Sequence, residues 1–164
     1  MTSADNAKKD VEPGPVVESF FEDIEVGRYR SAGPITVTAE EIVSFAERYD
    51  PLPMHISDEG GQETIHDSLI ASGVLTIALK QRLIMRVERN KAIIGAARIE
   101  EQNFLKPVRA GDELTMHQTC TRKRESKTRQ DRGLIFWEFE IRNQHGDAVF
   151  SSRDAIMLRR RPAG

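Results

Sequence analysis

The chain has 164 residues, of which 24 are Lys or Arg and 26 are Asp or Glu, so its formal net charge is −2. This length suits one domain, and the charge lacks the basic excess that nucleic-acid binding requires. A single cysteine, Cys120, excludes an internal disulfide and a cysteine-based metal cluster. We therefore expect a soluble cytoplasmic protein that binds no nucleic acid, with Cys120 filling its core.

The first fifteen residues are polar and include Pro13 and Pro15. They contain no apolar run long enough for a signal peptide or a membrane span. We expect residues 1–15 to be a disordered tail and residues 16–161 to form one domain without membrane association.

The first predicted helix begins at Thr38 and ends at Asp50. Thr38 and Glu41 have the spacing of a capping box, and apolar residues follow at intervals of three and four up to Tyr49. Asp50 precedes Pro51, and a residue in that position is pushed out of the helical region. The helix should therefore deliver the Asp50 carboxylate at its end.

The segment after this helix, residues 50–55 (DPLPMH), separates a carboxylate from an imidazole. Pro51 and Pro53 should make the spacer a rigid loop, which would hold Asp50 and His55 with little conformational entropy left to lose. A carboxylate and an imidazole fixed in this way are candidates for an acid/base pair. Both residue types are also common at protein surfaces, and the spacing by itself favours that ordinary interpretation.

Residues 69–89 contain no proline and one glycine, and they predict a long central helix of about six turns. The first half is apolar in every direction, which indicates that its N-terminal turns are buried. The unpaired N–H groups at such an end can donate hydrogen bonds to a carbonyl or an oxyanion. Asp67 and Ser68 are also favoured capping residues, and a capping side chain would occupy the same groups.

From Ala92 onward the pattern changes to alternation of apolar and polar residues, which is typical of strands. Four strands are predicted at about residues 93–105, 112–122, 135–141 and 149–158, after a short strand around Ile35. We expect consecutive strands to pair as an antiparallel meander, with the central helix buried on one face. The expected fold class is α+β.

Three segments, residues 45–55 (FAERYDPLPMH), 66–73 (HDSLIASG) and 103–112 (NFLKPVRAGD), together resemble the MaoC-like dehydratases. This family of hotdog-fold proteins includes the (R)-specific enoyl-CoA hydratases, and the resemblance extends over roughly residues 20–160. It implies a long helix wrapped by an antiparallel sheet. It also implies a homodimer, with or without further assembly, that acts on an acyl-CoA thioester.

The resemblance also implies roles for particular residues. Asp50 and His55 would bind one water, remove a proton as its oxygen adds to C3 of an enoyl thioester, and return a proton to C2. The backbone N–H of Asp67 would be the oxyanion donor. No metal or cofactor is implied, because coenzyme A is part of the substrate. The implied substrate contacts are Ser68, Ser72 and Gly73.

Two residues depart from the family pattern, since Leu52 replaces an Asn of the motif and Asp67 stands where a glycine is common. Two alternative functions stay open. A hotdog thioesterase would direct water at the thioester carbonyl, and an acyl-CoA-binding or partner subunit would have no turnover.

The remaining polar candidates are weaker. His66 is a rival acid/base residue because it lies near the expected helix start, whereas we expect His117 and His145 to be exposed to solvent. Residues 122–129 predict a solvated hairpin, whose basic side chains are a lesser candidate for contact with coenzyme A phosphates.

Overall fold

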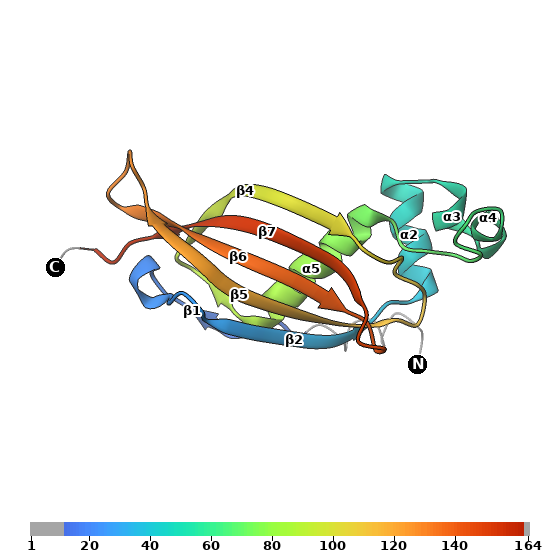
Figure 1. Cartoon of the computed structure of the whole chain (residues 1–164), viewed down its shortest axis with the longest axis horizontal. Helices are drawn as coiled ribbons and strands as arrows, with labels where there is room; N and C mark the ends of the chain where they lie inside the picture. The colour runs from blue at the N-terminus through green and yellow to red at the C-terminus, as the bar shows by residue number, and fades with distance from the viewer. Residues whose placement is uncertain (1–11, 163–164) are drawn as a thin grey trace.

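The structure is a computed structural model that describes residues 12–162, and it is built around a five-stranded antiparallel sheet with one long helix across a face (Figure 1). This arrangement confirms the expected α+β class. The elements are β1 Val16–Val17, η1 Phe21–Asp23, β2 Tyr29–Thr36, α2 Ala39–Tyr49, α3 Pro53–Ile56, α4 Asp58–Gln62, α5 Gly73–Val87, β3 Arg89–Asn90, β4 Ile93–Phe104, β5 Glu113–Glu125, β6 Arg132–Arg142 and β7 Ala148–Arg159.

The strand order of the sheet is β2-β5-β6-β7-β4, and every neighbouring pair is antiparallel. Strands β5, β6 and β7 form the predicted meander. The prediction is wrong for β4, which pairs with β7 instead of β5. Helix α5 carries the chain across the sheet before β4, so β4 joins the far edge, and the segment after it returns to start β5.

The inner face of the sheet is the apolar face that the alternation predicted. Leu114, Met116 and Cys120 of β5 are buried, and their polar neighbours lie on the opposite face. Helix α5 lies across this face (Figure 1), and its Leu79 and Leu83 belong to the same buried hydrophobic cluster as the strand residues. Each fully buried side chain of this size contributes about 1.5–3 kcal/mol, so the contact of helix and sheet is a main source of stability.

Helix α2 has the predicted limits. The Glu41 amide donates to Thr38 Oγ1 at 3.1 Å, which is the expected N-cap bond. At the other end, the Asp50 amide donates to the Ala46 carbonyl at 2.9 Å, and Asp50 itself leaves the helical conformation ahead of Pro51.

Helix α5 begins at Gly73, four residues later than predicted. Residues 69–71 are held in another conformation by bonds to distant segments. The Ile70 amide donates to the Met54 carbonyl at 3.1 Å, and the Ala71 amide donates to the Val108 carbonyl at 2.8 Å. The apolar side chains of these residues are buried, as predicted. The backbone N–H groups of Ile70 and Ala71, however, bond to carbonyls of other segments and not to carbonyls of α5.

Residues 1–11 of the predicted tail lie outside the described residues. Gly14 and Pro15, which the prediction also assigned to the tail, contact the end of α5. The Gly14 amide donates to the Met85 carbonyl at 2.9 Å, and the Pro15 carbonyl accepts from the Arg89 amide at 2.8 Å. Within residues 12–162, no helix combines the length and apolar character needed to cross a membrane.

Candidate active site

Asp50 and His55 lie close together, as the sequence predicted, although the spacer is only partly a loop. Helix α3 begins at Pro53, so His55 sits in a single helical turn. Asp50 Oδ2 lies 3.7 Å from His55 Nε2. That distance is too long for a direct hydrogen bond, but an oxygen atom of a water or substrate can bond to both groups at once.

The imidazole of His55 is buried, with 5% of the residue exposed. Its Nδ1 lies 2.8 Å from the Ile70 carbonyl oxygen. A carbonyl oxygen only accepts hydrogen bonds, so Nδ1 must carry the proton. In the neutral ring, Nε2 is then the free base, and it is the atom that faces Asp50.

Asp50 is held by the start of α5. The Ser72 hydroxyl donates to Asp50 Oδ2 at 2.6 Å, and the same hydroxyl oxygen accepts from the Val74 amide at 3.2 Å. Ser72 is therefore the N-cap of α5 and the anchor of the carboxylate. A negative charge near a helix N-terminus is also favoured by the helix dipole.

The three segments that carry the family resemblance meet at this site. Met54 and Ile70 join the first two through a backbone hydrogen bond. Ala71 and Val108 join the second and third, and the Arg109 guanidinium donates to the Ser68 hydroxyl. Segments that are far apart in the sequence thus enclose the acid/base pair.

Asp67 does not lie at the start of the central helix, because α5 begins six residues later. Asp67 is exposed, has a φ of 57°, and its amide donates to the Thr64 carbonyl at 3.3 Å. This left-handed conformation suits glycine and is tolerated by Asp. The first N–H of α5 belongs to Gly73, and its amide has no hydrogen-bond acceptor within residues 12–162. The role of Asp67 as a donor stays a prediction.

A Cβ at Gly73 would lie 2.9 Å from the Phe104 ring, so a side chain there would displace this ring. The aromatic ring of Phe104 in turn contacts Phe150, with ring centroids 5.3 Å apart. The implied substrate contacts at Ser72 and Gly73 thus lie beside the acid/base pair, at the helix start.

Helix α4 contributes residues that the sequence reasoning missed. Asp58 Oδ1 accepts from the Leu69 amide at 3.1 Å, and this bond fixes the segment before Ile70. A Cβ on Gly61 would lie 2.0 Å from the Ser68 carbonyl oxygen, so only glycine allows this approach. Two adjacent glycines, Gly60 and Gly61, are unusual in a helix, and this signal could have indicated close backbone packing.

The weaker polar candidates lie elsewhere. His117 is partly exposed, and its Nδ1 lies 2.5 Å from the Tyr29 hydroxyl. His145 is exposed in a turn, as expected, and the amide of His66 donates to Thr64 Oγ1. The turn between β5 and β6 lies at the opposite end of the long axis from α2, α3 and α4 (Figure 1). That hairpin therefore lies away from Asp50 of its own chain.

No group of three or more His, Cys, Asp or Glu side chains in the described part of the chain is arranged to hold a metal ion. The described residues bring a carboxylate, an imidazole, a hydroxyl and main-chain amides to this site.

Known proteins share this arrangement of helix and sheet. A family model described as a MaoC like domain matches residues 23–134. A MaoC-like dehydratase from Rhodospirillum rubrum superimposes with a TM-score of 0.80 at 34% identity, over 88% of this chain and 99% of that one. The (R)-hydratase PhaJ1 from Pseudomonas aeruginosa has a TM-score of 0.71 at 22% identity, over 89% of each chain.

A further relative, described as uncharacterized protein YdeM of Bacillus subtilis (strain 168), is 25% identical over 141 residues, which cover 85% of this chain and 99% of that protein. These likenesses identify the architecture as a hotdog fold. The chain belongs to the MaoC-like dehydratase family.

Proposed function

We propose that this protein is a hydratase/dehydratase that adds water reversibly to a 2-enoyl-CoA to give a 3-hydroxyacyl-CoA. The observation that carries the proposal is the fixed pair of Asp50 and His55, whose facing atoms are 3.7 Å apart. Membership of a family of dehydratases supports it. The chemistry of the pair supports it as well, since both groups can hold the same water.

In the proposed reaction, the water donates one hydrogen bond to the Asp50 carboxylate and the other to His55 Nε2. As the water oxygen bonds to C3, its proton passes to Nε2 and the C2–C3 double-bond electrons move toward the thioester, which gives an enolate. The pair then returns a proton to C2, so that one water is added overall. A positioned acid/base group of this kind is worth about 10²–10⁴ in rate.

The enolate oxygen needs a hydrogen-bond donor, which is worth about 2.7–4 kcal/mol in such reactions. The family resemblance assigns this role to the Asp67 amide. Asp67→Gly keeps the amide and the left-handed conformation, so we expect it to retain activity. A loss of turnover in this variant with unchanged folding would contradict the assignment to a backbone amide. The Asp67 amide already donates to the Thr64 carbonyl, whereas the Gly73 amide has no acceptor among residues 12–162 and is the alternative donor.

The proposal includes a homodimer that pairs through β4. This strand forms an edge of the sheet over twelve residues and is exposed along nearly all its length, including Ile94. Long edge strands with apolar side chains pair readily with another chain. We expect a mass in solution of about twice 18.5 kDa, and a lower mass for Ile94→Lys. Val26→Lys changes an exposed apolar residue elsewhere and serves as the control.

The decisive experiment follows the absorbance of the conjugated enoyl thioester in the wild type, Asp50→Asn and His55→Gln. We expect both variants to lose about 10²–10⁴ in rate, and the control His145→Gln to behave as the wild type. Equal activity in all four proteins would overturn the proposed roles. Release of free thiol from acyl-CoA would instead indicate a thioesterase.

A further inference from the structure

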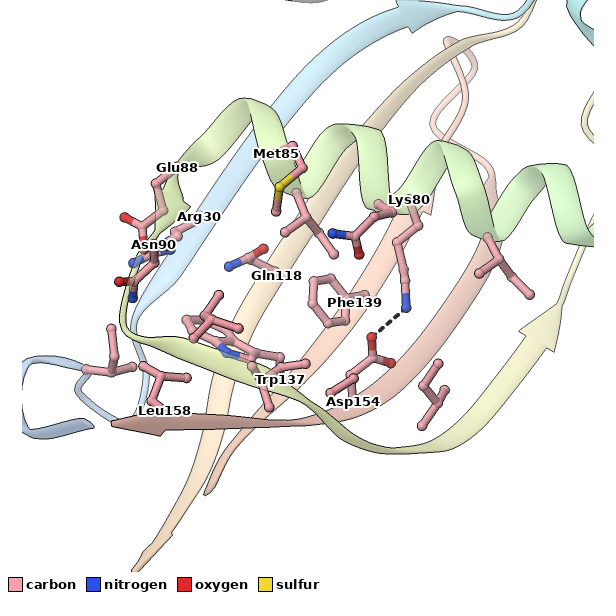
Figure 2. A pocket seen from close by; sticks show the side chains of 18 residues that line it. Arg30, Lys80, Met85, Glu88, Asn90, Gln118, Trp137, Phe139, Asp154 and Leu158 are labelled. Carbon is pink, nitrogen blue, oxygen red and sulfur yellow. Dashed lines mark hydrogen bonds and ion pairs between the residues drawn. The ribbon is translucent and has the colours of Figure 1, made fainter. Parts of the chain in front are cut away.

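A second feature of the chain is a cavity of about 270 Å³ between α5 and the inner face of the sheet (Figure 2). Its walls are mainly apolar, and the helix side is formed by residues from Ile77 to Glu88. On the sheet side lie Trp137 and Phe139 of β6 and Leu158 of β7. A cavity with these walls suits an aliphatic chain.

Two polar side chains from neighbouring strands of the sheet project into this apolar cavity. Arg30 of β2 is the register partner of Gln118 of β5, and Gln118 is the partner of Phe139. Partners in an antiparallel pair project from the same face, with Cβ atoms about 4.5–5.5 Å apart. Both Arg30 and Gln118 line the cavity, and Figure 2 shows Gln118 between Arg30 and Phe139.

Each of these two side chains has a buried atom without a partner. Gln118 Oε1 and Arg30 Nη2 make no hydrogen bond, although Gln118 is only 4% exposed. Arg30 Nη1 is paired with Glu88 at 2.7 Å, which leaves Nη2 as the open donor. An unsatisfied buried polar atom is unfavourable, so an open acceptor and an open donor on two register partners indicate a ligand that supplies both.

The charges around the cavity favour an uncharged ligand group. Arg30 is matched by Glu88, and Lys80 is matched by Asp154, whose Oδ2 lies 2.6 Å from the Lys80 ammonium. A carboxylate entering this space would meet two existing anions and no unpaired cation. A hydroxyl group, in contrast, can donate to Gln118 Oε1 and accept from Arg30 Nη2 without adding charge.

Helix α5 connects this cavity to the acid/base site. Ser72, which anchors Asp50, precedes Ile77 by five residues and Lys80 by eight, or about 7.5 and 12 Å along the helix axis. An acyl chain whose C3 lies at Asp50 and His55 would therefore have to extend about 7.5–12 Å along α5 to enter the cavity.

We propose that the substrate is an acyl thioester with a hydroxyl group on the distal part of its chain, and that Gln118 and Arg30 bind this hydroxyl in the cavity. The inference rests on the proposed hydratase function and adds the substrate class. Neither residue touches the reacting carbons, so both determine which substrate is bound and take no part in the reaction itself.

The kinetic test compares 2-enoyl-CoAs of increasing chain length, each with its ω-hydroxy counterpart. At the length that spans the cavity, the wild type should prefer the hydroxylated substrate by about tenfold in kcat/KM. Gln118→Met, which keeps the size of the side chain, should lose that preference and keep its rate on crotonyl-CoA. Gln130→Met, in the exposed turn between β5 and β6, is the matched control.

A binding test separates this inference from the proposed function. Trp137 is the only tryptophan and lines the cavity, so its fluorescence can follow binding of octan-1-ol and of 1-methoxyoctane, which cannot donate a hydrogen bond. We expect tighter binding of the alcohol in the wild type and no difference in Gln118→Met. If Gln118→Met does not fold, the comparison in the wild type decides alone.

The outcomes are distinct. Hydration of crotonyl-CoA without preference for any hydroxylated substrate would overturn the inference and leave the hydratase function standing. Absence of hydration for every enoyl-CoA would overturn the function, and the alcohol comparison would then decide whether the cavity binds a hydroxyl. Equal binding of alcohol and ether would overturn hydroxyl recognition.

Discussion

The ion pair between Lys80 and Asp154 is buried in the core, and its removal should change stability strongly. The Lys80 ammonium lies 2.6 Å from Asp154 Oδ2 and 3.0 Å from the Ser152 hydroxyl. Lys80 is 2% exposed and Asp154 is 6% exposed. Substitution of Lys80 by Met would leave the Asp154 carboxylate in the core without a cation.

Removing one partner of a buried pair lowers the free energy of unfolding by about 3–5 kcal/mol. Typical domains have about 5–15 kcal/mol in total, so Lys80→Met should lose a large share of its stability. The melting temperature should fall by roughly 6–20 °C for a chain of this size. The double variant Lys80→Met/Asp154→Leu buries no charge and should regain most of this loss.

Urea unfolding followed by Trp137 fluorescence measures these differences, since this tryptophan is buried in the same core. Lys106→Met is the control, because its 2.9 Å pair with Asp147 is exposed and should be worth less than about 1 kcal/mol. Equal losses in the single and double variants, or no loss in Lys80→Met, would refute the reasoning.

Three further predictions concern the site and the core. Ser72→Ala removes the bond to Asp50 and the N-cap of α5. The free energy of unfolding should therefore fall by about 2 kcal/mol in denaturation assays, and the hydration rate should fall by about tenfold. Ser72→Thr, which keeps the hydroxyl, should restore both. Gly61→Ala forces a Cβ against the Ser68 carbonyl and should lower the melting temperature, whereas unchanged melting would contradict the close approach. Burial raises the pKa of the Cys120 thiol, so iodoacetamide should label it only after unfolding, as mass spectrometry can check.

The elements of the fold were predictable because their signals are local. The cap at Thr38 and the alternation along β5 and β6 depend on residues within a few positions of one another. The position of β4 at the far edge was not predictable in this way, because it depends on the path of α5 across the sheet. The start of α5 was misjudged for a similar reason, since Ile70 and Ala71 bond to distant segments.

The candidate site was predictable only in part. Asp50 and His55 are close in sequence, and the prolines between them drew attention to the pair. The anchor at Ser72 lies 22 residues from Asp50, and the open atoms of Arg30 and Gln118 come from different strands. Such partners are set by the folded chain, so composition and spacing do not reveal them.

The partner of the His55 Nδ1 atom is a main-chain carbonyl, and this has a consequence for variation at position 70. Every amino acid at that position supplies the same carbonyl oxygen. Ile70 can therefore be exchanged for other apolar residues over evolution without disturbing the ring tautomer. Comparing side chains among relatives would not mark this position, although its backbone selects which imidazole nitrogen is free.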